Sequence, residues 1–272
     1  MKKQNFKDFE WVIVDDGSKD DTELVVNNFI QDKILNIRYY KKINGGKHTA
    51  INKGLELAQV EYFFIVDSDD WLPENSLEIA NKWIETLDDD KIIAVGGIRA
   101  YSSKKYIGST FIGEFLDCKS TERKKYGITG DKAELWKTDF LNQYRFPEFN
   151  GENFLSECVV WNKISLDGYK VRWFNEIIYY CEYLEGGLTN TKGKFFTNYQ
   201  GFIELVSVNQ KCKEISYCER LKELVICCVY AKKKKYDYVE LAKKLNTNKI
   251  KIAFLAFCGN LVYKMLGGSV NE

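Results

Sequence analysis

Two acidic clusters, each directly after an apolar run, are the features of this sequence with the clearest chemical meaning. Asp15-Asp16 follows the run 11–14, and Asp67-Ser68-Asp69 follows the run 62–66. Acids in such places often cap a helix or remain solvated. The D-x-D spacing, however, can present two carboxylates to one hard cation, whose other ligands come from phosphate and water. The pattern therefore favours a Mg²⁺ or Mn²⁺ site that receives a diphosphate.

Predicted strands and predicted helices alternate along the chain around these clusters. Apolar runs predict strands at 11–14, 37–40, 62–66 and 92–95, and amphipathic segments predict helices at 20–30, 47–58 and 73–87. This order predicts an α/β fold with an open, mostly parallel sheet. Ligands of such sheets lie beyond the carboxyl ends of the strands, which is where both clusters fall. We expect three parts: a first half at 1–100 that carries both acidic clusters, a second half at 101–190 and a helical extension at 191–272.

A glycine turn precedes the second predicted helix. Lys47 and His48 follow Asn44-Gly45-Gly46 at its first turn, where backbone N–H groups attract phosphate. Both side chains are therefore candidates for contact with a nucleotide. For His48 the alternative is an ordinary surface position, and the glycines also suit a tight turn.

Three segments together carry a family resemblance: Phe9-Glu10-Trp11-Val12-Ile13-Val14-Asp15-Asp16-Gly17-Ser18, Asn44-Gly45-Gly46-Lys47-His48-Thr49-Ala50 and Phe64-Ile65-Val66-Asp67-Ser68-Asp69-Asp70. In order and spacing they resemble family 2 glycosyltransferases of the GT-A fold, over residues 1 to about 190. The resemblance implies that the half at 1–100 binds the nucleotide sugar and that the half at 101–190 binds the acceptor. The resemblance implies that Asp16, beside Asp15, reads the nucleobase, that Asp67 lies near the ribose or metal and that Asp69 holds the metal. It also implies that the family's first strand and most of its first helix would precede residue 1, so we expect a fragment or a late start.

The candidate general base is Glu157. In the family, an acidic pair stands at the start of a late helix. Counting back from Gly168 places Glu157 at the second acid, with Ser156 in place of the first. Helical periodicity independently places Glu157 on the apolar arc of Phe154 and Trp161, where a carboxylate is costly without a function or partner. The alternative is an ion pair with a basic residue such as Arg172.

Acceptor contacts are expected from the segment 130–137 and from the residue after the acidic cluster. Asp131 and Trp136 resemble an acceptor-side loop of one branch of the family, and Trp71 directly follows Asp70. An aromatic face suits a pyranose ring. Both tryptophans also fit a hydrophobic core.

Composition excludes other classes. A net charge of +1 does not favour nucleic acid. The eight cysteines form no CxxC pair and there is one histidine, which argues against zinc and for reduced thiols in the cytoplasm. Neither a signal peptide nor a bilayer-spanning run is evident. The tail 249–266 fits either an interfacial helix at the inner face of the membrane or a helix packed on the catalytic domain.

These features predict an inverting hexosyltransferase. The donor would be a nucleoside-diphosphate sugar, UDP-linked by family default, and the acceptor a glycan or a lipid-linked sugar in surface polysaccharide assembly. Two alternatives remain: a truncated, non-catalytic nucleotide-sugar or glycan-binding protein of the same fold, and another metal-dependent nucleotide enzyme such as a nucleotidyltransferase. The second would be expected to have a Gly-rich basic loop near the start.

Overall fold

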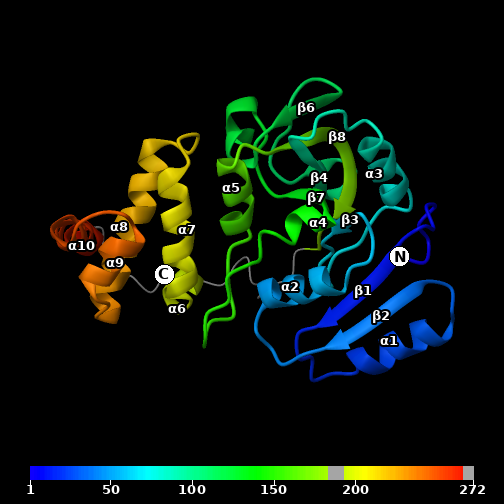
Figure 1. Ribbon diagram of the computed structural model, residues 1–272, viewed down its shortest axis with the longest axis horizontal. Coiled ribbons are helices and arrows are strands. Elements are labelled where there is room, and N and C mark those ends of the chain that lie inside the picture. The colour runs from blue at the N-terminus through cyan, green and yellow to red at the C-terminus, as the bar shows by residue number, and fades with distance from the viewer. Residues whose placement is uncertain (183–192, 266–272) are drawn as a thin grey trace.

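A computed structural model describes residues 1–182 and 193–265. It shows a mixed α/β body followed by a group of helices (Figure 1). Strands β1 (Glu10–Asp15) and β2 (Asn36–Lys41) are parallel, are joined through α1 (Thr22–Gln31), and form a two-stranded sheet. This sheet carries Asp15 at its carboxyl end, as the sequence predicts.

The larger sheet has six strands. Its order is β3 (Tyr62–Phe64), β7 (Lys132–Lys137), β4 (Ile92–Ser102), β8 (Lys170–Tyr180) and β6 (Phe115–Cys118), with β5 (Lys105–Tyr106) added to β4. β4 and β8 are parallel, and β7 is antiparallel to both β3 and β4. Strands β3, β4 and β8 therefore point the same way, and the α/β class is confirmed with a mixed sheet.

Strand β4 is longer than the run 92–95 predicts. A Cβ on Gly96 would lie 2.7 Å from the Trp173 ring, and one on Gly97 would lie 2.6 Å from the Trp83 ring. The two glycines interrupt the apolar pattern, yet they allow large rings to pack directly on the strand. The apolar pattern predicts that the strand ends before these glycines, because the pattern does not include the rings that cover them.

Helix α2 (Lys47–Leu57) lies across both sheets. A Cβ on Gly54 would lie 3.2 Å from Phe63 of β3 and 3.9 Å from Val14 of β1, so this glycine allows close contact with each. Within the described residues, β1 pairs only with β2 and β3 pairs only with β7, which leaves each with an unpaired edge.

Aromatic stacks fasten helices to both faces of the larger sheet. On one face, Trp83 of α3 (Ser76–Ile84) stacks on Phe174 with ring centroids 4.5 Å apart. On the other, Trp161 of α5 (Cys158–Leu166) stacks on Trp136 at 4.4 Å. The second stack fixes the rotation of α5 against β7, which matters for the site at the beginning of α5.

The helical extension is confirmed as helical and is joined to the body by a shared core. Its helices are α6 (Lys194–Thr197), α7 (Tyr199–Lys211), α8 (Tyr217–Lys234), α9 (Tyr238–Lys244) and α10 (Lys249–Met265). One hydrophobic cluster runs from Trp136 through α7 to Ile252. α10 packs on α8 and α9 and lies farthest from the sheet (Figure 1). Among the described residues, no helix has the length and apolarity needed to cross a membrane.

Substitution of Gly46 tests how closely the turn before α2 contacts Asn153, and Gly151 is the matched control. Gly46 and Gly151 both have positive φ, +90° and +78°. A Cβ on Gly46 would lie 1.9 Å from the Asn153 carbonyl oxygen, whereas one on Gly151 would meet nothing within 4 Å. We expect Gly151→Ala to lower the free energy of unfolding by about 1 kcal/mol and Gly46→Ala by more than about 3 kcal/mol, measured by urea denaturation. Equal losses would show that the contact with Asn153 is not tight.

Candidate active site

One lysine joins the two predicted halves of the site. The Lys47 ammonium, on the first residue of α2, lies 2.6 Å from Oδ1 of Asp67 and 2.8 Å from Oε1 of Glu157. Asp67 follows β3, and Glu157 is the N-cap residue directly before α5. All three side chains are only partly exposed. Asp67, the carboxylate expected near the metal, and Glu157, the candidate base, are thus brought to a single cation.

The electrostatics of this cluster favour the charged forms. Burial alone would lower the pKa of Lys47, but the carboxylates of Glu157 and Asp67 outweigh it and raise that pKa above its usual value. Burial would likewise raise the pKa of Asp67, and the cations of Lys47 and Arg99 lower it instead. Each charge therefore depends on its partners to remain in a partly desolvated place.

Two further residues complete the cluster, and sequence reasoning missed both. Arg99 of β4 lies 3.5 Å from Oδ2 of Asp67, and its guanidinium lies 4.1 Å from the centroid of the Tyr179 ring. The Tyr179 hydroxyl accepts a hydrogen bond of 2.9 Å from the Asp67 backbone N–H. The available signal was a single arginine inside an otherwise apolar strand.

Glu134 of β7 lies in the segment 130–137, from which acceptor contacts are expected, but no role was predicted for its own side chain. The stack of Trp136 on Trp161 shows where it lies. Glu134 precedes Trp136 by two residues and so lies on the same face of its strand. Glu157 precedes Trp161 by one helical turn and so lies on the same side of α5. Burial, with a contribution from Glu157, raises the pKa of Glu134 to about 7 against the attraction of Arg123 and Arg99.

The segment before Glu157 is held by the N-terminal end of α7. Both oxygens of Glu152 accept hydrogen bonds there, from the backbone N–H groups of Gln200 at 2.7 Å and Gly201 at 2.9 Å. Asn198 in turn accepts from the backbone of residues 153 and 154. The helical extension thereby positions the candidate base.

The expected alternative, an ion pair between Glu157 and Arg172, is wrong. Arg172 binds Asp117 and Asp88 on the far side of the sheet, at 2.7 and 2.8 Å. Glu157 is paired instead with Lys47, which the sequence places more than a hundred residues away.

Asp16 and Asp15 have different surroundings. Oδ1 of Asp16 accepts from the Gly45 N–H at 2.9 Å and from Lys42 at 2.6 Å, while Oδ2 accepts from the Gly46 N–H at 2.7 Å. Asp16 therefore closes the glycine turn, and Oδ2 has capacity for one more donor.

The Asp15 side chain has no exposed surface. It accepts from the Tyr39 hydroxyl at 2.6 Å and from the Ser18 N–H at 2.7 Å. Burial would raise its pKa, but these hydrogen bonds hold the pKa of Asp15 below its usual value. The expected contact of Asp15 with a nucleotide is corrected to a structural role beneath the turn, because no face of its carboxylate is open.

His48 is buried, so its alternative reading as a surface residue is wrong. Only 2% of the residue is exposed, and its Nδ1 atom has no hydrogen-bond partner in the structure. Burial lowers the pKa of His48, which favours the neutral ring at physiological pH. It lies one residue beyond Lys47, inside the first turn of α2.

The carboxylates suit a hard divalent cation in type and spacing. Asp69 is exposed and forms no ion pair or hydrogen bond recorded within the described chain, whereas both oxygens of Asp67 face cations. The described residues contain no group of three or more acids, histidines or cysteines arranged to hold a metal ion. Mg²⁺ or Mn²⁺ needs only one or two carboxylates when phosphate and water complete its shell, so Asp69 fits as the accessible ligand.

The three expected acceptor residues differ in exposure. Trp71 is 48% exposed, with its ring centroid 5.6 Å from that of Tyr180, and Asp131 is exposed beside Glu134. Trp136 is 1% exposed. Its expected sugar contact is corrected, because its stack on Trp161 leaves no face for a ligand.

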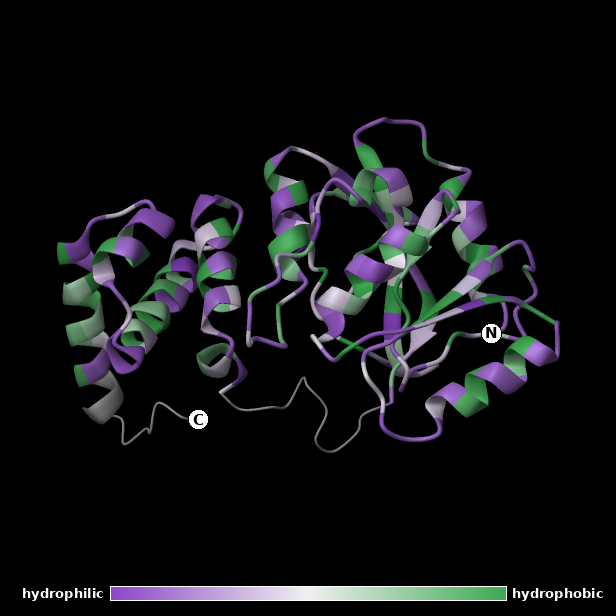
Figure 2. Cartoon of the chain, turned by 60° about the horizontal axis from the view of Figure 1, so that its bottom comes forward, coloured by the Kyte–Doolittle hydropathy of each residue, from purple (hydrophilic) through white to green (hydrophobic). Residues whose placement is uncertain are grey.

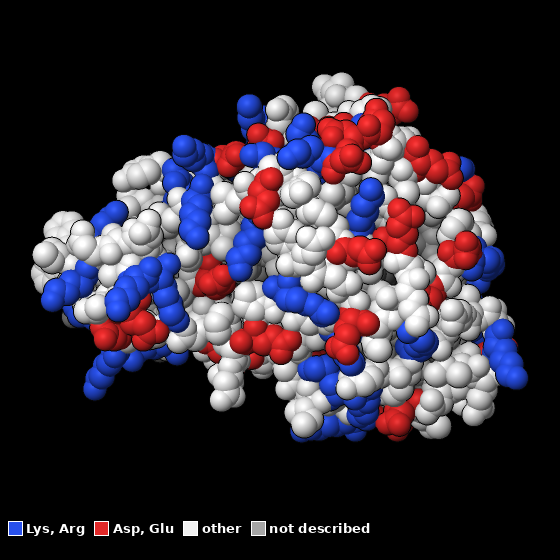
Figure 3. Space-filling model, in the orientation of Figure 1, with Lys and Arg blue, Asp and Glu red and all other residues white. Residues whose placement is uncertain are grey.

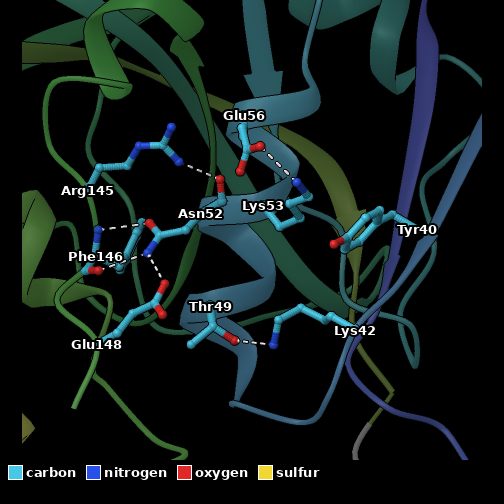
Figure 4. Close-up of a pocket in the computed structure, with 9 residues that line it drawn as sticks. All are labelled: Tyr40, Lys42, Thr49, Asn52, Lys53, Glu56, Arg145, Phe146 and Glu148. Atoms are coloured by element: carbon cyan, nitrogen blue, oxygen red, sulfur yellow. Dashed lines mark hydrogen bonds and ion pairs between the residues drawn. The ribbon is translucent and has the colours of Figure 1, made fainter. Parts of the chain in front are cut away.

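A hollow of about 480 Å³ lies on the other side of α2 (Figure 4). Asn52 spans it, donating to the Phe146 carbonyl at 2.9 Å and to Glu148 at 2.7 Å, and the Phe146 N–H donates back to Asn52 at 2.9 Å. None of the cluster around Lys47 lines this hollow. Its contacts tie α2 to the segment that leads into α5.

The sequence of this chain is similar to that of known glycosyltransferases. The family model described as "Glycosyl transferase family 2" matches residues 1–144. Glycosyltransferase GlyG of Streptococcus pneumoniae is 26% identical over 205 residues, which cover 70% of this chain and 66% of GlyG. A GalNAc(5)-diNAcBac-PP-undecaprenol beta-1,3-glucosyltransferase of Campylobacter jejuni is 27% identical over 256 residues, covering 89% of this chain and 77% of that protein.

Solved structures agree on the fold. The structure of S. aureus TarS 1–349 in complex with UDP superposes with a TM-score of 0.58 at 20% identity, covering 85% of this chain and 65% of that one. This chain therefore spans about two thirds of the length of GlyG and of that TarS chain. Since the family model covers more than half of the sequence, and the fold agrees, the chain belongs to the family 2 glycosyltransferases.

Proposed function

We propose that this chain is an inverting glycosyltransferase that moves a sugar from a nucleoside-diphosphate donor, UDP-linked, to a glycan or lipid-linked acceptor at the cytoplasmic face of a membrane. The observation that carries the proposal is the contact of Lys47 with both Asp67 and Glu157. It brings a donor-side carboxylate and an acceptor-side carboxylate to one place. The UDP in the TarS structure and the undecaprenol-linked name of the Campylobacter relative support the classes of donor and acceptor.

The donor would lie against the carboxyl ends of β1 and β3. Oδ2 of Asp16 can accept from a base N–H, and Lys47 and the N-terminal end of α2 offer positive charge to the diphosphate. Asp69, with Asp67 behind it, would hold Mg²⁺ or Mn²⁺. When bound, the metal neutralises the charge of the departing diphosphate.

Glu157 is the general base of this proposal. It takes the proton from the acceptor hydroxyl as that oxygen forms a bond to the anomeric carbon, while the bond from that carbon to the diphosphate breaks on the opposite face. Attack opposite the leaving group inverts the anomeric configuration. Lys47 supplies the opposite charge that holds Glu157 beside the donor.

The second candidate is a nucleotide-sugar or glycan-binding protein of the same fold without catalysis. The observation that favours it is the engagement of both Asp67 oxygens with cations, Lys47 and Arg99. Binding without turnover would distinguish it from the enzyme.

Removal of the accessible metal ligand tests the donor site. We expect Asp69→Ala to weaken Mn²⁺-dependent binding of UDP by more than about tenfold in calorimetric titration, because the exposed carboxylate of the D-x-D pair is lost. Asp90→Ala removes an exposed acid outside the cluster and serves as the matched control. UDP binding that is indifferent to both Mn²⁺ and Asp69 would refute the metal assignment.

Substitution of the base separates catalysis from binding. We expect Glu157→Gln to lower kcat by about 10²- to 10⁴-fold, since the amide cannot accept the acceptor proton, while the Kd for UDP changes little. Glu176→Gln, at an exposed position of β8, is the control. A folded wild type that binds donor but transfers no sugar to any acceptor would favour the binding-protein alternative.

The buried acid beside the base predicts a pH effect on stability. The pKa of Glu134 is about 7 in the folded chain against an ordinary value of 4.5, so the native state holds this proton more tightly than the unfolded state does. Loss of the proton as pH rises from 4.5 through 7 therefore favours unfolding.

Glu134→Gln should remove this contribution. Relative to wild type, we expect the variant to gain about 1 to 3 kcal/mol in free energy of unfolding between pH 5 and pH 8, measured by urea denaturation at each pH. Glu176→Gln should show no such change. A constant difference between wild type and Glu134→Gln across this range would mean that Glu134 is already ionised at pH 5.

A further inference from the structure

The outer face of α10 is apolar and exposed over three turns. Its large side chains are Ile250 (74% exposed), Phe254 (64%), Phe257 (62%) and Leu261 (48%), here called the α10 stripe. At about 100° per residue these positions fall within one narrow arc of the helix. A lone exposed apolar side chain is ordinary, whereas four on one arc form a patch.

The opposite arc of α10 is firmly packed, so the stripe has a defined direction. Ile252 and Ala256 are buried, and a Cβ on Gly259 would lie 2.6 Å from Val225 and 2.7 Å from Val229 of α8. Because α8 contacts the helix this closely, α10 cannot rotate to hide the stripe. In Figure 2 the helix that ends in the grey C-terminal trace is the outermost element of the molecule.

Lysines flank the stripe without acidic partners. Lys249 and Lys251 fall on its two sides, and the Lys232 ammonium lies 5.8 Å from the centroid of the Phe257 ring. These three lysines are exposed and form no ion pair recorded in the described part of the chain. Residues 249–261 contain no Asp or Glu. Figure 3 shows lysines and arginines at this end of the molecule, with uncharged surface between them and an acidic patch beside them.

We propose that the α10 stripe and its flanking lysines dock this protein on the surface of an anionic phospholipid bilayer. Phenylalanine and aliphatic side chains enter the boundary between headgroups and acyl chains, and the lysines meet lipid phosphates. The surface selects lipid over a second copy of the chain, because self-association through the stripe would bring these lysines together. Lysine is also depleted from the cores of protein interfaces.

This inference goes beyond the proposed function and can be tested without a donor or acceptor. The full chain is sedimented with vesicles of phosphatidylcholine alone and of phosphatidylcholine with phosphatidylglycerol. We expect binding to the anionic vesicles that weakens as salt is raised. Phe254→Ser with Phe257→Ser should reduce it by more than about tenfold, and Lys249→Gln with Lys251→Gln by about tenfold.

A matched control removes apolar side chains that are equally exposed but distant from α10. Ile34 and Ile112 lie on the α/β body and are 59% and 104% exposed. Their double serine variant should bind anionic vesicles as the wild type does. UDP titration of each variant shows separately whether the donor site is intact, so loss of docking and failure of the proposed function are distinguishable.

Two results would overturn the proposal. One is the absence of binding to anionic vesicles by the folded wild type. The other is a dimer in solution, detected by light scattering, that the Phe254→Ser and Phe257→Ser changes dissociate, since this would assign the stripe to a second copy of the chain.

Discussion

The contact of one ammonium with two carboxylates constrains the whole site. Lys47 begins α2, Asp67 lies three residues after β3 and Glu157 is the N-cap residue of α5. The two contacts are 2.6 and 2.8 Å long. Three segments that are far apart in the sequence must therefore place these charged atoms accurately relative to one another. Loss of one partner would leave a partly desolvated charge uncompensated, which is more costly than an ordinary lost contact.

Much of the surrounding structure can be understood as the means of holding these three residues. Asp16 closes the glycine turn before Lys47. Gly54 lets α2 lie against both sheets, so Lys47 is placed relative to the strands that end at Asp15 and Phe64. Glu152, bound to the first turn of α7, fixes the approach to Glu157. The helical extension is thus part of the site's support as well as the carrier of the α10 stripe.

Charges of both signs are balanced in the cluster, and one acid differs from the rest. Asp67 is held ionised by Lys47 and Arg99, whereas Glu134, facing the same region from β7, has its pKa raised to about 7 by burial. Environments that push neighbouring acids apart in pKa are characteristic of sites that move protons. The difference between the pKa values of Asp67 and Glu134 arises from their burial and from the positions of the neighbouring cations. Neither can be predicted from the local sequence.

Local patterns were sufficient for the elements and for the expectation that acids gather at strand ends. Apolar runs and helical periodicity are properties of neighbouring residues, so the sequence by itself determined the α/β class and the helical tail. The candidates Asp67, Asp69 and Glu157 came from the D-x-D spacing and from helical periodicity together with the resemblance to family 2 glycosyltransferases. Tertiary structure decided which candidates have an open face. Asp15 and Trp136 are buried, and His48 lies inside the first turn of α2. Arg99 and Glu134 reach the cluster from two different strands, β4 and β7. Burial and pairing depend on which segments pack together across the sheet, and that information is nonlocal.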